Sequence, residues 1–181
     1  MGLSPVVFYD LRYDQNNKSP IIFLKDSTSD RFLPVWIGEA EAVSIEFASR
    51  GQSPPRPLTH DLLKRVFERS GIKLVSVIID RLIGSTYYAN LVMEIDGEEV
   101  EIDCRPSDAV ALALRDGAQI FVADDLMYNI KFVEMAAAEA EADEDGHVVD
   151  EGAGEGEEVE AEGIDFRRIL RELRPDDFQE N

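Results

Sequence analysis

A two-residue turn, Asp96-Gly97, separates two runs of alternating residues in the segment YYANLVMEIDGEEVEID, and it constrains the fold more than any other part of the sequence. Asp-Gly favours the tight turns that join neighbouring antiparallel strands. The alternation predicts eight residues that face the core: Tyr87, Ala89, Leu91, Met93 and Ile95 on one arm, and Val100, Ile102 and Cys104 on the other. The apolar segment at 73–80 precedes this hairpin and predicts a three-stranded antiparallel meander.

The remaining elements follow from composition and turn signals. Strands are predicted at 3–14, 20–26, 31–38 and 119–125, and helices at 39–50, 60–70 and 108–116. Thr59 and Ser107 are suitable N-cap residues for the second and third helices. The second helix carries an apolar stripe of Leu62, Leu63, Val66 and Phe67. Because strands and helices come in separate runs, the predicted fold class is α+β, a largely antiparallel mixed sheet packed with helices in a single compact domain.

The composition changes abruptly near residue 136. We therefore predict a domain at 1–135, an acidic disordered linker at 136–163 and an amphipathic helical tail at 164–181. In the tail, four apolar residues recur at helical spacing: Phe166, Ile169, Leu170 and Leu173. A helix this short is marginal alone, so residues 164–178 are expected to dock onto their own domain, a neighbouring subunit or a partner protein.

Charge and hydropathy bear on partners and location. A formal net charge of −20 argues against a polyanion partner, but residues 139–162 alone hold twelve Asp and Glu with no Lys or Arg, so much of the excess is local. No apolar run is long enough to cross a bilayer, and a single cysteine, Cys104, excludes an internal disulfide. We expect a cytoplasmic protein that makes no membrane contact.

Polar residues crowd the join between the last hairpin strand and the third helix: Asp103, Arg105, Ser107 and Asp108. Helix capping alone accounts for Ser107 and Asp108. In extended geometry Arg105 lies on the same side as Asp103, and the two can pair. A guanidinium held by a carboxylate at a helix N-terminus also suits phosphate binding.

A second polar cluster surrounds the start of the second helix, with Arg56, His60 and Asp61. A neutral imidazole at this position could accept a proton or bind a metal, although a surface histidine after a cap is the simpler interpretation. Glu39 and Glu41 open the first helix and add carboxylates of the type that Mg²⁺ and Mn²⁺ prefer. None of these spacings is a specific metal motif.

Several motifs occur in one order: LPVWIGEAEAVSIEFASRG, PPRPLTHDLL, VSVIID, STYYANLVM and EIDCRPSDAVALALRDGAQIFVADD. Together they resemble the bifunctional nuclease family over about residues 3–135. The resemblance implies a compact α+β domain that cleaves single-stranded DNA and RNA with the help of Mg²⁺ or Mn²⁺.

The resemblance and the residue chemistry together nominate site residues. The candidates for catalysis are His60, Asp61, Arg105 and Asp108. Those for substrate binding are Arg56, Arg105 and Ser107, and those for metal binding are Asp61, Asp108, Glu39 and Glu41. In a metal-assisted hydrolysis, His60 would act as base or acid and Arg105 would steady the phosphate charge.

Two structural expectations accompany this hypothesis. The helix starts at His60/Asp61 and at Arg105/Ser107/Asp108 should converge on one cleft, and the sheet edges favour a homo-oligomer. The alternative function is a non-catalytic regulatory or interaction domain that recruits a partner through its terminal helix.

Overall fold

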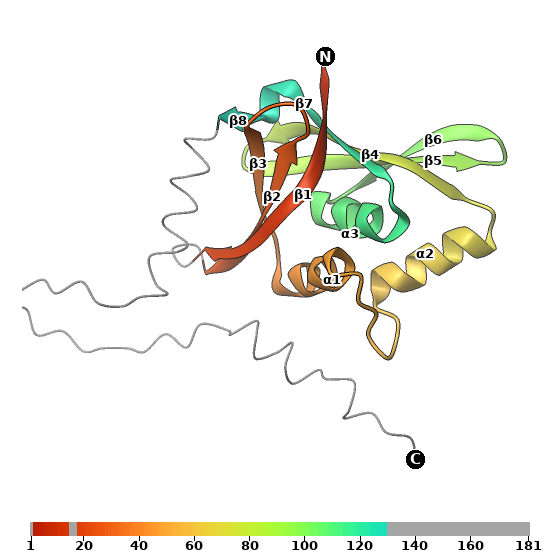
Figure 1. Ribbon diagram of the computed structural model, residues 1–181. Coiled ribbons are helices and arrows are strands. Elements are labelled where there is room, and N and C mark those ends of the chain that lie inside the picture. The colour runs from red at the N-terminus through yellow and green to blue at the C-terminus, as the bar shows by residue number, and fades with distance from the viewer. Residues whose placement is uncertain (1, 15–17, 130–181) are drawn as a thin grey trace, which may run out of the picture.

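The computed structural model describes residues 2–14 and 18–129 (Figure 1). In chain order the elements are β1 (Leu3–Asp14), β2 (Ser19–Asp26), β3 (Arg31–Trp36), α1 (Glu39–Ser49), α2 (Thr59–Arg69), β4 (Lys73–Ile83), β5 (Thr86–Ile95), β6 (Glu98–Cys104), α3 (Pro106–Asp116), β7 (Gln119–Ala123), the 3₁₀ turn η1 (Asp124–Leu126) and β8 (Tyr128–Asn129). The strands and helices predicted within residues 3–125 all occur, with bounds that shift by a few residues.

One sheet contains all of these strands, in the order β6-β5-β4-β7-β1-β2-β3-β8. β7 joins the two meanders, β1 to β3 and β4 to β6, because it pairs antiparallel with β1 and parallel with β4. The other pairs are antiparallel. The predicted α+β class with a largely antiparallel mixed sheet is therefore confirmed.

α3 is the central helix of the domain. It packs against β4, β5 and β7 and against both other helices (Figure 1). Most of its residues are buried, and three of them are alanines, at 109, 111 and 113. Such small side chains let a helix lie close to its neighbours on every side. Gly117 ends the helix with φ +73°, a left-handed conformation that glycine adopts without strain.

The Asp96-Gly97 turn forms as predicted, with φ +53° and +83° at its two residues. Ala89, Leu91 and Met93 are buried, which confirms the inward face of β5. The expectation for β6 is wrong for two of its three residues: Cys104 packs against the core, but Val100 and Ile102 pair with Met93 and Leu91 and remain 38% and 41% exposed. β6 is the edge strand of the sheet, whereas β5 lies inside it and packs against α3.

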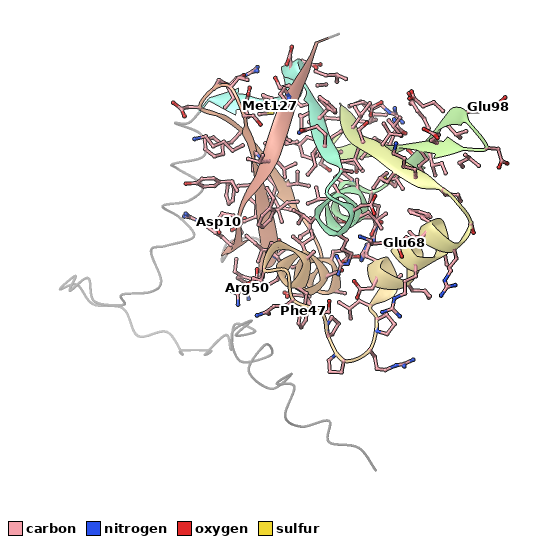
Figure 2. All side chains as sticks on the ribbon, turned by 45° about the vertical axis from the view of Figure 1, so that its right-hand side comes forward. Asp10, Phe47, Arg50, Glu68, Glu98 and Met127 are labelled. Atoms are coloured by element: carbon pink, nitrogen blue, oxygen red, sulfur yellow. The ribbon has the colours of Figure 1, made fainter. Side chains whose placement is uncertain are left out.

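The apolar stripe on α2 is only partly buried. Phe67 packs against the core, whereas Leu62, Leu63 and Val66 are 57%, 36% and 46% exposed. α2 lies at the margin of the helix layer, at the end of the molecule that also holds the β5–β6 turn (Figure 2). Its apolar side consequently has little of the domain to pack against.

Both predicted N-caps are wrong. Leu58 occupies the N-cap of α2, and its backbone N–H donates to Asp61 Oδ2 at 2.8 Å. Arg105 occupies the N-cap of α3, with Pro106 as the first helical residue. Proline suits that position because its fixed φ is already helical and the missing N–H needs no partner there. Ser107 lies one residue further on and is buried.

The predicted linker at 136–163 and tail helix at 164–181 lie outside the described residues. Within the described part of the chain, no helix has the length and apolar content that a membrane span requires.

Candidate active site at two converging helix starts

The starts of α2 and α3 converge, as the sequence analysis expected. His60 Nε2 of α2 lies 3.0 Å from Asp108 Oδ1 of α3. The other ring nitrogen, Nδ1, lies 2.8 Å from the hydroxyl of Ser44 on α1. Three helices thus meet at His60, whose side chain is 11% exposed.

Arg105 forms the outer part of the same cluster. Proline at the next position biases Arg105 toward the extended backbone observed, with φ −76° and ψ 147°. Its side chain donates to both oxygens of Asp108, at 2.8 and 3.0 Å, and its Nη1 lies 2.7 Å from Glu41 Oε1. The expected pairing with Asp103 is wrong, because Asp103 lies 3.6 Å from Arg81 instead.

The charge states of this cluster follow from its hydrogen bonds. Burial alone would raise the pKa of Asp108, but hydrogen bonds from Arg105 and His60 hold that pKa below its usual value. An ionised Asp108 can only accept, so His60 Nε2 must carry the proton of their hydrogen bond. In the neutral ring, Nδ1 then accepts from Ser44. The hydrogen bond to Asp108 likewise raises the pKa of Arg105 and keeps its guanidinium charged.

A pocket of about 380 Å³ opens beside these residues. Its lining comes from α1, from the α2 start and from the α3 start: Ala40, Glu41, Val43, Ser44, Leu58, Thr59, His60, Arg105 and Asp108. The exposed fraction of the Arg105 side chain is 64%, so it faces solvent at the pocket. The cluster is therefore open to a ligand from the side of Arg105.

The other nominated residues lie outside this pocket. Asp61 Oδ1 accepts from Arg115 at 2.6 Å while Oδ2 accepts from Leu58, and these contacts hold the pKa of Asp61 low against the effect of burial. Burial raises the pKa of Glu39. Arg56 is exposed in the loop before α2. Ser107 lines a second pocket on the β3 and β5 side of Arg105.

Sequence reasoning missed two residues that organise the site. Ser44 is buried in α1 and fixes His60, and Arg115 near the end of α3 fixes Asp61 at the start of α2. A serine within an otherwise helical segment and a basic residue in a last helical turn are common features. Neither carried a signal in the sequence that could have singled it out.

The carboxylates do not form a closed metal centre. No group of three or more His, Cys, Asp or Glu suited to a metal ion occurs within residues 2–14 and 18–129. Both oxygens of Asp61 are engaged, which leaves Glu41 and Asp108 at the pocket. Two carboxylates fit a Mg²⁺ ion only if water and substrate phosphate supply its other ligands.

Comparisons with known proteins place this geometry in a family. A family model described as the bifunctional nuclease domain matches residues 22–134. An uncharacterized protein of Mycobacterium tuberculosis strain H37Rv is 34% identical over 169 residues, which cover 93% of this chain and 94% of that protein.

Two rice proteins are similar over a shorter part. Bifunctional nuclease 1 and Bifunctional nuclease 2 of Oryza sativa subsp. japonica are 30% and 31% identical over 125 and 123 residues, respectively. These regions cover 66% and 65% of this chain but 38% of each plant protein. Since the family model matches more than half of the sequence and includes both helix starts of the candidate site, the chain belongs to the bifunctional nuclease domain family.

Proposed function

We propose that the protein is a nuclease that hydrolyses phosphodiester bonds in single-stranded DNA and RNA at the pocket beside Arg105. One observation carries the proposal: a solvent-facing guanidinium and an ionised carboxylate, Asp108, lie side by side in a pocket at two helix N-termini. Helix N-termini favour anions, and the guanidinium geometry matches phosphate oxygens.

Arg105 has the capacity to hold a phosphate without losing its present partners. Its contacts with Asp108 and Glu41 use three of its five N–H groups. The other two, one on Nη1 and one on Nη2, can donate to the non-bridging oxygens of a phosphodiester. This contact would stabilise the charge that develops on those oxygens during the reaction.

Asp108 is the group that can orient the attacking water. His60 and Arg105 occupy Oδ1, and Arg105 occupies one position on Oδ2, which leaves Oδ2 able to accept another hydrogen bond. The water oxygen would bond to phosphorus as the ester P–O bond breaks. The carboxylate would take the water proton, and solvent would protonate the leaving oxygen. His60 and Ser44 act as positioning residues in this scheme, because they hold Asp108 in place.

A divalent cation is part of the proposal because the pocket carries two carboxylates against one guanidinium. This excess of negative charge would repel a phosphodiester, so Mg²⁺ or Mn²⁺ bound by Glu41 and the substrate phosphate, beside Asp108, would offset it. Such an ion would also polarise the phosphate and lower the pKa of a bound water.

The test is cleavage of labelled single-stranded RNA and DNA by the full chain with Mg²⁺, with Mn²⁺ and with chelator. We expect cleavage that requires one of the two ions and is lost in Asp108→Asn. His60→Ala, which removes a residue that holds Asp108 in place, is expressed and purified in the same way. Cleavage that is equally strong in both variants comes from a contaminating nuclease. Activity equal in wild type and both variants would overturn the proposal.

A specific observation favours the alternative, a non-catalytic regulatory or protein-interaction role. Leu62, Leu63 and Val66 form an exposed apolar side on α2, and β6 at the same end is rich in exposed acids. Residues 164–178 combine apolar residues, which complement the apolar side of α2, with four arginines, at 167, 168, 171 and 174, which complement the acids of β6. Under this alternative the tail segment covers α2. In the full chain, Leu170→Asp should then accelerate amide exchange in α2, and unchanged exchange would contradict the docking.

The oligomeric state stays a prediction. The unpaired edge of β6 supports the expected homo-oligomer, since edge strands readily pair with a second chain. Sedimentation equilibrium of the full chain measures the copy number, and a monomer at all concentrations would contradict the expectation.

A further inference from the structure

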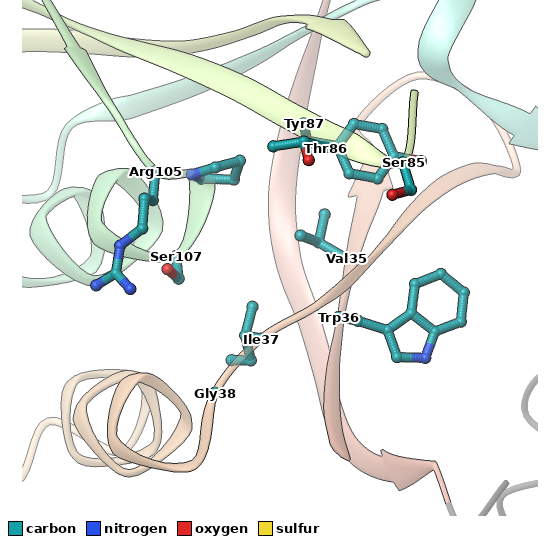
Figure 3. A pocket seen from close by; sticks show the side chains of 10 residues that line it. Val35, Trp36, Ile37, Gly38, Ser85, Thr86, Tyr87, Arg105 and Ser107 are labelled. Atoms are coloured by element: carbon teal, nitrogen blue, oxygen red, sulfur yellow. The ribbon is translucent and has the colours of Figure 1, made fainter. Parts of the chain in front are cut away.

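A second pocket of about 380 Å³ adjoins Arg105 and has no role in the reaction described above. Three segments line it: residues 35–38 at the β3–α1 junction, residues 85–87 at the start of β5, and residues 105–107 at the start of α3. Figure 3 shows Arg105 and Ser107 on one side of this pocket and the Trp36 indole on the opposite side. Arg105 is the one residue that lines both this pocket and the pocket of His60 and Asp108.

The lining combines an apolar surface with hydroxyl groups. Val35, Ile37 and Pro106 supply aliphatic surface, and Trp36 and Tyr87 supply aromatic rings. Ser85, Thr86 and Ser107 supply hydroxyls that can both donate and accept. Arg105 is the sole charged residue of the lining. These groups suit a flat, uncharged ring with polar edges that is attached to an anionic group.

Trp36 is held in place for such a contact. Its indole Nε1–H donates to Asp14 Oδ2 at 2.6 Å, while the residue remains 41% exposed. The hydrogen bond restrains the ring without burying it, so less conformational freedom is lost when a ligand stacks on it. An exposed, fixed aromatic ring is the usual stacking surface for bases of single-stranded nucleic acid.

We propose that this pocket binds one nucleobase of a single-stranded substrate whose adjacent phosphate lies on Arg105. The inference rests on the proposed function, because it takes Arg105 as the phosphate contact. A base and its neighbouring phosphate are joined through one sugar. Because Arg105 lines both pockets, a phosphate bound by Arg105 would place the adjacent base at the second pocket. A base paired within a duplex cannot enter such a pocket without leaving the stack, so the pocket selects single strands.

Binding can be followed directly, because Trp36 is the only tryptophan of the chain. The full-length Asp108→Asn variant, which is expected not to cleave, is titrated in the presence of Mg²⁺ with an octamer of thymidylate and with an octamer of the same backbone that carries abasic sugars. We expect the thymidylate octamer to quench Trp36 emission and to bind about five- to 100-fold more tightly, the range for stacking one base on an aromatic ring. Equal affinities without quenching would overturn the proposal.

Matched variants locate the base. Trp36→Leu and Tyr87→Leu should each reduce the preference for bases over abasic sugars to within about two-fold, as measured by anisotropy of labelled octamers. Tyr88→Leu is the control, because Tyr88 is the next residue along β5 and lies beneath Arg81 at 4.9 Å, outside the pocket. It should retain the preference. The preference is a ratio within one variant, so a partly unfolded fraction does not alter it. A preference that survives in both pocket variants would place the base elsewhere.

These results separate this inference from the proposed function. If the chain cleaves abasic and thymidylate strands equally well and binds them equally, the base pocket is wrong and the nuclease proposal stands. If the base preference depends on Trp36 and Tyr87 but no cleavage occurs with either ion, the pocket stands and the nuclease proposal is wrong.

Discussion

Nε2 of His60 lies 3.0 Å from Oδ1 of Asp108, although the two residues are 48 positions apart in the chain. This contact joins the first turn of α2 to the first turn of α3. It also fixes which ring nitrogen carries a proton, because an ionised carboxylate accepts from Nε2.

Arg105→Gln should reduce kcat/KM for single-stranded substrates by about 10²- to 10³-fold, since it removes the charged donors to the phosphate. Arg69→Gln removes the same charge from the far end of α2 and should leave the rate within about two-fold. Initial rates with a labelled oligonucleotide measure both. A similar loss in the two variants would point to a general charge effect.

The neutral His60 ring should be the Nε2–H tautomer in solution. Long-range ¹⁵N–¹H correlation spectra report the tautomer, and the other histidine, His147, can be assigned with His147→Gln. In Ser44→Ala, Nδ1 loses its buried partner, and we expect kcat to fall by about five-fold, the typical worth of one such hydrogen bond. An Nδ1–H tautomer in the wild type would contradict the assigned roles of Asp108 and Ser44.

Asp26 should stabilise the fold in a pH-dependent way. It is buried at the end of β2; although burial alone would raise its pKa, hydrogen bonds from Thr28, Ser29 and Arg31 hold that pKa well below its usual range. Asp26→Asn should therefore cost about 2–3 kcal/mol at neutral pH. Because the folded-state pKa is depressed, this contribution is present above the unfolded pKa near 4 and declines as the pH falls below it.

Urea unfolding of wild type and Asp26→Asn at several pH values measures this dependence. The gap between the two free energies of unfolding should narrow below about pH 4. A gap that widens toward acid would show that the ionised form is not the stabilising one.

Two valines in helices should respond differently to truncation. Val110 in α3 is 0% exposed, and Val66 in α2 is 46% exposed. Val110→Ala should lower the free energy of unfolding by about 2–3 kcal/mol, whereas Val66→Ala should change it by less than about 0.5 kcal/mol. Urea unfolding measures both. A large loss in Val66→Ala would show that another surface covers α2 in solution.

Deletion of residues 139–181 should raise the affinity for single-stranded nucleic acid at low salt. The segment 139–162 holds twelve Asp and Glu with no Lys or Arg and would repel a polyanion. Salt screens this repulsion, so the difference between full-length and truncated chains should shrink as ionic strength rises. Binding titrations at two salt concentrations test it, and identical affinities at both would remove the electrostatic role of the segment.

The sequence by itself determined the local structure. Asp96-Gly97 defines the hairpin because only a few residue pairs accept positive φ at both positions of a tight turn. Gly117 ends α3 for an equally local reason, whereas the helix begins at Pro106, before the predicted start at residue 108. The convergence of the two helix starts was predictable as a hypothesis, from the charge and dipole that both starts share.

Only the tertiary structure decided which surfaces are covered and which side chains pair. Val100 and Leu62 follow apolar patterns as regular as those of buried residues, yet both remain exposed, Val100 on the edge strand β6 and Leu62 on α2 at the margin of the helix layer. Arg105 pairs with Asp108 and Glu41 rather than Asp103, and Asp61 pairs with Arg115. Periodicity defines the face of one element, whereas burial and ion pairing depend on neighbours that are distant in the chain and are positioned only when β7 joins the two meanders.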